Sequence, residues 1–136
     1  MKTLSILLIE DDEIETIKFK RVLDSMNIKY NLTLSKNGEE ALTILQEENK
    51  TPDVIFLDLN MPKMNGTEFL KILKKNAALK YIPAMILTTS NNRTDILECY
   101  TIGIAGYILK PLRYEDYKEK IKIAVAYWSN NELIKL

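Results

Sequence analysis

The chain is 136 residues long, which suits one domain with a core of its own. Its 19 basic and 19 acidic residues cancel, which argues against a general electrostatic surface for nucleic acid or membranes. No apolar run approaches the roughly 20 residues of a membrane span, no signal peptide precedes the first apolar run, and a single cysteine suits a cytoplasmic protein.

Apolar runs of strand length alternate with amphipathic helical stretches along the chain. In chain order, the pattern predicts a strand over 4–9, a helix over 13–26, a strand over 30–35, a helix over 39–48, a strand over 54–57, a helix over 67–76, a strand over 83–88, a helix over 94–102, a strand over 106–109 and a helix over 114–129. We expect Asn91, Asn92 or Thr94 to cap the fourth helix. We expect one domain over residues 1–136, with no output domain.

Five strand–helix units with uninterrupted apolar strands predict an α/β fold, a doubly wound five-stranded parallel sheet with helices on both faces. Right-handed crossovers leave two topologies, the dinucleotide-binding type and the flavodoxin-like type. The first strand–helix junction is Ile9-Glu10-Asp11-Asp12-Glu13 and contains no glycine. Because a phosphate cradle needs glycines at this junction, a dinucleotide cofactor or a P-loop nucleotide is disfavoured.

Polar side chains follow four of the predicted strands. They are Glu10, Asp11 and Asp12 after the first, Asp58 after the third, Thr88, Thr89 and Ser90 at the end of the fourth, and Lys110 after the fifth. Because the carboxyl ends of parallel strands meet at one edge of a sheet, we expect these groups to converge. Taken alone, Asp58 is equally explained as a residue that stops a strand or caps the next helix.

Histidine is absent from the chain, so a Ser-His-Asp triad, a Cys-His pair and a His-ligated zinc are excluded. Carboxylates without histidine or thiol favour a hard cation such as Mg²⁺, and Lys110 offers three donors to an anion. This set suits a phosphoryl group on Asp58, neutralised by the cation and Lys110 and bonded by Thr88. The alternative is that Lys110 only pairs with the acidic cluster.

The combination of an acidic pair after the first strand, Phe-Leu-Asp58-Leu-Asn-Met-Pro, Gly66, Thr88 and Lys110-Pro111 resembles the receiver domain of single-domain two-component response regulators. The resemblance implies strand order 2-1-3-4-5, phosphorylation of Asp58 and partnership with a sensor histidine kinase or phosphotransfer protein and a downstream target. It further implies Mg²⁺ held by the acidic pair, Asp58 and the Asn60 backbone carbonyl.

The same resemblance implies that Thr88 and Tyr107 are switch residues and that the Lys110–Pro111 peptide bond is cis. For Tyr107, a static aromatic at the sheet edge is the alternative. Three acids face a two-acid motif, so the register has two solutions. Because the first strand ends at Ile9, we favour Glu10 and Asp11 as the pair, with Asp12 starting the helix; Asp11 and Asp12 are the other solution.

The last predicted helix has more apolar residues than one sheet-facing stripe needs. Tyr117, Ile121, Ala124 and Trp128 cover the sheet, which leaves Ile123, Val125 and Tyr127 for a homodimer or partner surface formed with the fifth strand. A single wide stripe is the alternative. The Tyr127-Trp128 ending also resembles regulators that work with phytochrome-type kinases.

Two other functions remain to be weighed. A Mg²⁺-dependent phosphohydrolase would need a second acid beside Asp58, and Asn60 supplies an amide at that point. A receiver that had lost its chemistry would be a pure binding module, which the acidic pair, Asp58, Thr88 and Lys110 argue against. The sequence therefore predicts a phosphoryl-acceptor switch that assists its own phosphorylation and dephosphorylation and is not an enzyme acting on another substrate.

Overall fold

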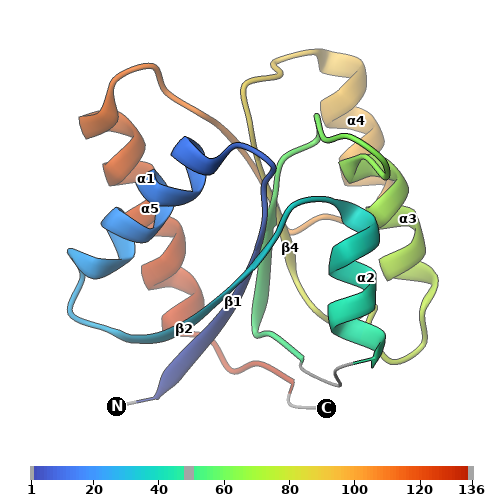
Figure 1. Ribbon diagram of the computed structural model, residues 1–136, viewed down its shortest axis with the longest axis horizontal. Coiled ribbons are helices and arrows are strands. Elements are labelled where there is room, and N and C mark those ends of the chain that lie inside the picture. The colour runs from blue at the N-terminus through green and yellow to red at the C-terminus, as the bar shows by residue number, and fades with distance from the viewer. Residues whose placement is uncertain (1, 48–50, 135–136) are drawn as a thin grey trace.

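The computed structural model describes residues 2–47 and 51–134 and contains the ten predicted elements in the predicted order (Figure 1). The strands and helices are β1 (Thr3–Ile9), α1 (Glu13–Asp24), β2 (Lys29–Ser35), α2 (Gly38–Glu47), β3 (Val54–Leu57), α3 (Gly66–Lys75), β4 (Ala84–Thr88), α4 (Arg93–Ile102), β5 (Gly106–Leu109) and α5 (Tyr114–Ser129). No helix within the described residues is long and apolar enough to cross a membrane.

The five strands form one sheet in the order β2-β1-β3-β4-β5, and every pairing is parallel. The doubly wound, flavodoxin-like order is therefore confirmed. In this register Ile9 lies opposite both Ser35 and Leu57, and Thr88 lies opposite Leu109. The residues that follow these positions consequently leave the sheet at one edge, and that edge carries the candidate site.

Alternate residues of the strands β1, β3, β4 and β5 pack into two separate core layers, one on each face of the sheet. In β1, Leu7 and Ile9 pack under α2, α3 and α4, while Ile6 and Leu8 pack under α1 and α5. Figure 1 shows the same division, with α1 and α5 on one side of the sheet and the other three helices opposite. Because both faces are covered, the central strand β3 is fully buried at each of its four positions.

The helix ends follow local capping chemistry. The Asp12 carboxylate accepts hydrogen bonds from the Ile14 and Glu15 backbone N–H groups and so begins α1. Asn92 caps α4 in the same way, which selects one of the three predicted caps. The predicted first helix was two residues too long, since α1 ends at Asp24. The last residue predicted for the second helix, residue 48, lies outside the described residues.

The predicted surplus face of α5 is partly wrong. Val125 is fully buried, where it packs in the layer beneath α1 and α5 with Tyr117, Ile121 and Ala124. Ile123 and Tyr127 are exposed, at 62% and 59% of their surface. The apolar stripe of α5 is therefore wider than one line of contacts, because the helix packs against both α1 and the sheet. Only Ile123 and Tyr127 remain for an external partner.

We expect Val125→Glu to destabilise the fold by about 3–5 kcal/mol, since it places an unpaired carboxylate in a sealed apolar layer. Ile123→Glu on the same helix should change stability by less than about 0.5 kcal/mol, because its side chain faces solvent. Urea denaturation followed by Trp128 fluorescence measures both. Equal stability of the two variants would contradict the burial of Val125.

Candidate functional site

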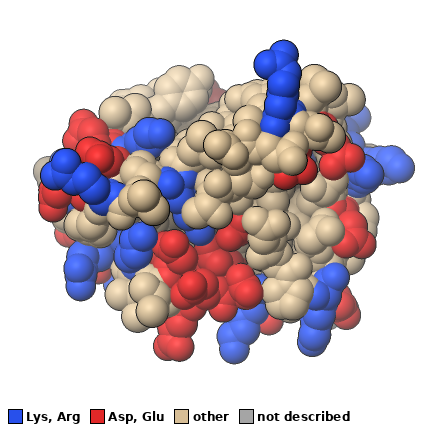
Figure 2. Space-filling model, turned by 90° about the horizontal axis from the view of Figure 1, so that it is seen from above, with Lys and Arg blue, Asp and Glu red and all other residues tan. Residues whose placement is uncertain are grey.

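The site lies at the edge of the sheet where the strands end. In Figure 2 the molecule is seen from above this edge, and acidic side chains gather in one patch near the middle of that face. The backbone holds the strand ends together: the Glu10 N–H donates to the Ser35 carbonyl, the Asp58 N–H to the Ile9 carbonyl, and the Lys110 N–H to the Thr88 carbonyl. The predicted convergence of these strand ends is thus observed.

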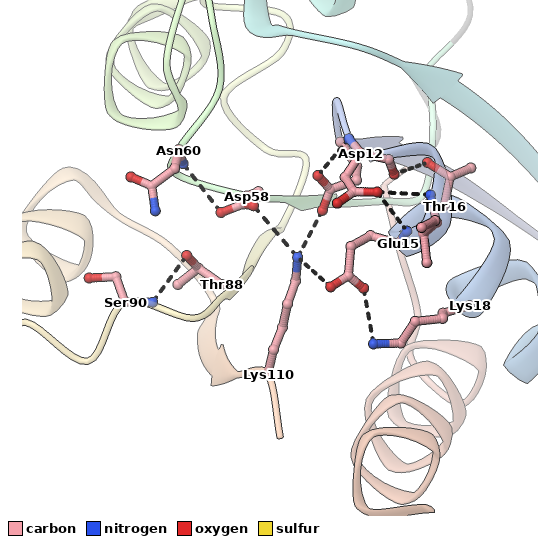
Figure 3. A network of polar contacts seen from close by, with 11 residues as sticks. Asp12, Glu15, Thr16, Lys18, Asp58, Asn60, Thr88, Ser90 and Lys110 are labelled. Carbon is pink, nitrogen blue, oxygen red and sulfur yellow. Dashed lines mark hydrogen bonds and ion pairs between the residues drawn. The ribbon is translucent and has the colours of Figure 1, made fainter. Parts of the chain in front are cut away.

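The Lys110 ammonium occupies the centre of the site (Figure 3). Its Nζ donates to Glu10 Oε1 at 2.8 Å and lies 3.5 Å from Asp58 Oδ2 and 3.7 Å from Glu15 Oε1. The side chains of Lys110 and Glu10 are only 6% and 5% exposed. A buried ammonium is therefore surrounded by three carboxylates, and a buried charge requires such partners to remain ionised.

Burial is the largest single influence on the pKa of both Glu10 and Lys110. It raises the pKa of the Glu10 carboxyl above its ordinary value, against the opposite pull of Lys110. Burial lowers the pKa of the Lys110 ammonium, but the Glu10 hydrogen bond and the charges of Glu10, Asp58 and Glu15 outweigh it and leave that pKa raised. Lys110 is therefore a fixed positive charge at neutral pH.

Asp58 sits at the head of a tight turn between β3 and α3. Its Oδ1 accepts a hydrogen bond from the Asn60 backbone N–H at 3.2 Å, and its Oδ2 faces Lys110. Gly66 lets the start of α3 approach this turn, because a Cβ there would lie 2.7 Å from the Asp58 carbonyl oxygen and 2.8 Å from Leu59 Cα. The Gly66 N–H donates to the Leu59 carbonyl and closes the turn.

The three acids after β1 have different surroundings. Glu10 is buried against Lys110, Asp11 is exposed, and the Asp12 carboxylate is engaged by the N-terminus of α1. Glu10 Oε2 also accepts from the Asp12 backbone N–H at 3.1 Å. With Asp12 acting as a helix cap, this geometry favours the register in which Glu10 and Asp11 form the acidic pair.

Thr88 and Tyr107 are joined through one residue of the loop between β4 and α4. The Ser90 N–H donates to Thr88 Oγ1 at 3.3 Å, and the Tyr107 hydroxyl donates to the Ser90 carbonyl at 2.8 Å. Ser90 Oγ donates to the Asp95 carboxylate in the first turn of α4. Thr88 is fully buried and Tyr107 is half-buried. The loop thus links the end of β4 to both α4 and β5.

The expected cis bond between Lys110 and Pro111 is wrong for this structure, since no peptide bond in the described part of the chain is cis. The trans form of an X–Pro bond is favoured by about 0.5–1 kcal/mol where nothing selects the cis form. The Lys110 side chain reaches the acidic cluster in the trans arrangement.

The donors at this edge fit a hard divalent cation in kind, because they are carboxylate and backbone oxygens without thiol or imidazole. They are not yet gathered around a common point: within the described residues, no three carboxylate, thiol or imidazole groups lie close enough to hold a metal ion. Lys110 lies between Glu10 and Asp58. A cation at this site therefore has to compete with the ammonium for the same two carboxylates.

Sequence reasoning missed Glu15 and the links through Ser90 and Asp95. Glu15 lies on a helix, where an acidic residue in the first turn is ordinarily explained by the helix dipole. One available signal was its position, since Glu15 lies in the first turn of α1, directly after the acidic residues that follow β1. Ser90 was noted at the end of β4 but was given no role.

The geometry defines a class of protein: an open parallel sheet with an aspartate, an acidic pair, a threonine and a lysine at its carboxyl edge. Residues 6–122 match the response regulator receiver domain family, and the chain belongs to this family. It is 32% identical over 128 residues to the response regulator Rcp1 of Synechocystis sp., covering 90% of this chain and 87% of that protein. It is 30% identical over 118 residues to the polar-differentiation response regulator DivK of Brucella anthropi, covering 87% and 93%.

Solved structures of relatives share the whole fold. The Mn²⁺-bound form of Rcp1 is similar with a TM-score of 0.91 and 32% identity, covering 97% of this chain and 99% of that one. The phosphorylated cyanobacterial phytochrome response regulator RcpA is similar with a TM-score of 0.93 and 28% identity, covering 98% and 100%. The predicted resemblance to phytochrome-associated single-domain regulators is confirmed.

This chain is therefore a phospho-accepting receiver domain of two-component signal transduction and not a classical enzyme. Domains of this family bind a divalent metal, and response regulators work with histidine kinases and downstream targets. Family membership argues against the phosphohydrolase alternative. Against a receiver that has lost its chemistry, the argument is the presence of the acidic pair, Asp58, Thr88 and Lys110.

We expect Gly66→Ala to destabilise the domain by about 1–3 kcal/mol, because the added methyl group collides with the backbone of the Asp58 turn. Thr67→Ala, at the next position of α3, is the matched control and should leave the turn unchanged. Urea denaturation gives the stability, and amide NMR shifts of residues 57–60 report the turn. Wild-type shifts in Gly66→Ala would contradict the close approach.

Proposed function

We propose that Asp58 is the phosphoryl acceptor of this receiver and that Mg²⁺ is its metal. The observation that carries this is the buried Lys110 ammonium 3.5 Å from Asp58 Oδ2. In the reaction, an Asp58 oxygen forms the new P–O bond while the bond from phosphorus to the imidazole nitrogen of the kinase's phosphohistidine breaks. The product is an acyl phosphate carrying about −1.5 to −2 charges at neutral pH.

We assign the metal ligands as Glu10, Asp11, Asp58 and the Asn60 backbone carbonyl. When bound, Mg²⁺ supplies positive charge to the transferring phosphoryl oxygens. Asp11 is exposed and has room to turn toward the cation, whereas Glu10 is already held beside Lys110. This difference favours direct ligation by Asp11 and an outer role for Glu10 through water.

Lys110 and Thr88 provide the remaining contacts in the proposed phosphorylated state. The ammonium would pair with one phosphoryl oxygen, and the buried Thr88 hydroxyl, now accepting from Ser90, would donate to another. A shift of Thr88 acts on Ser90, which also bonds Tyr107 and Asp95. We infer that phosphorylation reaches Tyr107 and α4 by this route, and that the domain assists both its phosphorylation and its hydrolytic dephosphorylation.

Exposed apolar side chains flank the acceptor and offer a docking surface for the kinase or phosphotransfer protein. Ile14 and Ile17 lie one turn apart on α1, 69% and 54% exposed, and Leu112 after β5 is fully exposed. We infer that these residues contact the donor protein near its phosphohistidine. We place the exchange in the cytoplasm, which the free thiol of Cys99 suits.

A second apolar surface lies along β5, the outermost strand on one side of the sheet. A groove of about 680 Å³ separates β5 from α5, and Tyr107, Ile123 and Tyr127 are among its lining residues. Because Tyr107 lines this groove, a movement of the switch changes the surface itself. We propose that the α4, β5 and α5 face binds the downstream target or a second copy of the chain. Sedimentation of Ile123→Glu beside wild type, with and without beryllofluoride, tests the homodimer.

Incubation of wild type with acetyl phosphate and Mg²⁺ should add one phosphoryl mass, and Asp58→Asn should abolish it, because the amide is not a nucleophile for this transfer. Intact-mass spectrometry measures the product, which should be lost at high pH as an acyl phosphate. Chelation with EDTA before the donor is added should also prevent it. A phosphoryl mass retained in Asp58→Asn would refute the assignment.

Asp11→Asn should weaken Mg²⁺ binding by roughly tenfold or more, since it replaces a charged ligand by a neutral one. Asp12→Asn is the control, because asparagine caps a helix as well as aspartate and the other register would make it the sensitive position. Calorimetric titration with Mg²⁺ gives both affinities. A larger loss in Asp12→Asn would establish the alternative register.

A further inference from the structure

Glu15 brings a third carboxylate to the Lys110 ammonium from a helix that supplies none of the proposed phosphorylation residues. It lies in the first turn of α1, and its side chain is 22% exposed. Glu15 Oε1 is 3.7 Å from Lys110 Nζ, close to the 3.5 Å that separates Nζ from Asp58 Oδ2. The helix dipole alone does not explain this contact, because an acidic residue in the first turn needs no lysine partner and Glu13 already places a negative charge there.

The ammonium lies between the two carboxylates without a hydrogen bond to either. Figure 3 shows Asp58 on one side of the Lys110 nitrogen and Glu15 on the other. The hydrogen bond goes to Glu10, which we assign to the metal site. Once a cation engages Glu10 and Asp58, Glu15 is, among the described residues, the remaining carboxylate within ion-pair distance of Lys110 that we do not assign to the metal.

We propose that Glu15 is a positioning residue that holds Lys110 back in the unphosphorylated state and releases it when Asp58 is phosphorylated. The inference rests on the proposed role of Asp58 as acceptor. Phosphorylation makes the Asp58 side chain more negative by about 0.5 to 1 charge, while the charge of the Glu15 carboxylate does not change. The ammonium therefore moves toward the phosphoryl group, and Glu15 sets how strongly that movement is opposed.

Lys18 is placed to take over Glu15 when Lys110 leaves. Its Nζ lies 3.2 Å from Glu15 Oε2, which is buried and has no hydrogen-bond partner among the described residues. The pair has the distance of an ion pair but not the angles of a hydrogen bond, so it has room to tighten. Lys18 Nζ also lies 4.5 Å from the centre of the Tyr117 ring on α5. Release of Glu15 thus reaches the contact between α1 and α5.

This role predicts opposite effects on the two ligands of the site. Removing the charge of Glu15 frees Lys110 for an anion, so beryllofluoride, which stands in for the phosphoryl group, should bind more tightly. The same change removes a negative charge near the cation, so Mg²⁺ should bind slightly more weakly. A residue with only a structural role would weaken both ligands together.

The experiment compares Glu15→Gln with Glu13→Gln, which removes an equal charge from the same helical turn. Beryllofluoride is titrated at saturating Mg²⁺, and Mg²⁺ is titrated alone, with amide NMR shifts as the readout. We expect Glu15→Gln to bind beryllofluoride about threefold to tenfold more tightly than wild type, which lies at or above the upper part of the range for an exposed ion pair. Its Mg²⁺ affinity should fall by no more than about threefold. Glu13→Gln should match wild type within about twofold.

Two further variants test whether the effect of Glu15 acts through Lys110 and depends on the reach of the Glu15 side chain. In a Lys110→Gln background, Glu15→Gln should no longer tighten beryllofluoride binding, because there is no ammonium to release. Glu15→Asp keeps the charge but shortens the reach by one methylene, so it should fall between wild type and Glu15→Gln and provides a test if Glu15→Gln folds poorly.

Equal binding by Glu15→Gln and Glu13→Gln would overturn the inference, as would weaker binding of both ligands. Tightening that persists without Lys110 would also overturn it, because the effect would then be that of charge alone. If wild type itself does not bind beryllofluoride with Mg²⁺, the proposed acceptor role fails and takes the inference with it. If wild type binds beryllofluoride with Mg²⁺ and Glu15→Gln binds it with the same affinity, the role of Glu15 is refuted while the acceptor role of Asp58 stands.

Discussion

The ammonium of Lys110, buried among the carboxylates of Glu10, Asp58 and Glu15, is the interaction on which the site depends. Taking an ammonium out of water costs several kcal/mol, and the fold recovers this only through carboxylates held at close range. Those carboxylates in turn repel one another without the lysine. In the unphosphorylated site, the attraction between the ammonium and the carboxylates therefore opposes the repulsion among the carboxylates. A divalent cation or a phosphoryl group alters this balance and so changes which carboxylate pairs with Lys110.

The parallel sheet holds these charged groups close together. Glu10 and Lys110 are 100 residues apart in the chain, yet two core layers fix the strands that carry them. Polar groups stand at the sheet edge, outside both layers, so the chemistry does not interrupt the apolar packing. Gly66 completes the frame by letting α3 close on the Asp58 turn. A sheet packed on both faces, with its charged side chains gathered at one edge, suits a switch whose charge changes while its fold does not.

Two chains of contacts lead away from the site. One runs from Thr88 through Ser90 to Tyr107 and to Asp95 on α4. The other runs from Lys110 through Glu15 to Lys18, beside Tyr117 on α5. The first ends at the groove between β5 and α5, and the second ends where α1 packs on α5. Helix α5 therefore borders both routes, which makes it the element best placed to combine them.

Strand and helix positions, the doubly wound class and the edge where Asp58 and Lys110 meet followed from the sequence alone. Apolar periodicity and polar residues at strand ends are local patterns, so they can be read directly from the order of residues in the chain. Three features needed the tertiary structure. Periodicity gives the direction of the apolar face of α5 but not its width, so Val125 joined the core only when α1 packed beside it. The bond before Pro111 is trans, where the resemblance implied cis, and the two forms of an X–Pro bond differ by only about 0.5–1 kcal/mol. Glu15 looks like any solvated helix acid until β5 brings Lys110 within 3.7 Å, because a pairing across 95 positions is a property of the fold and not of the chain.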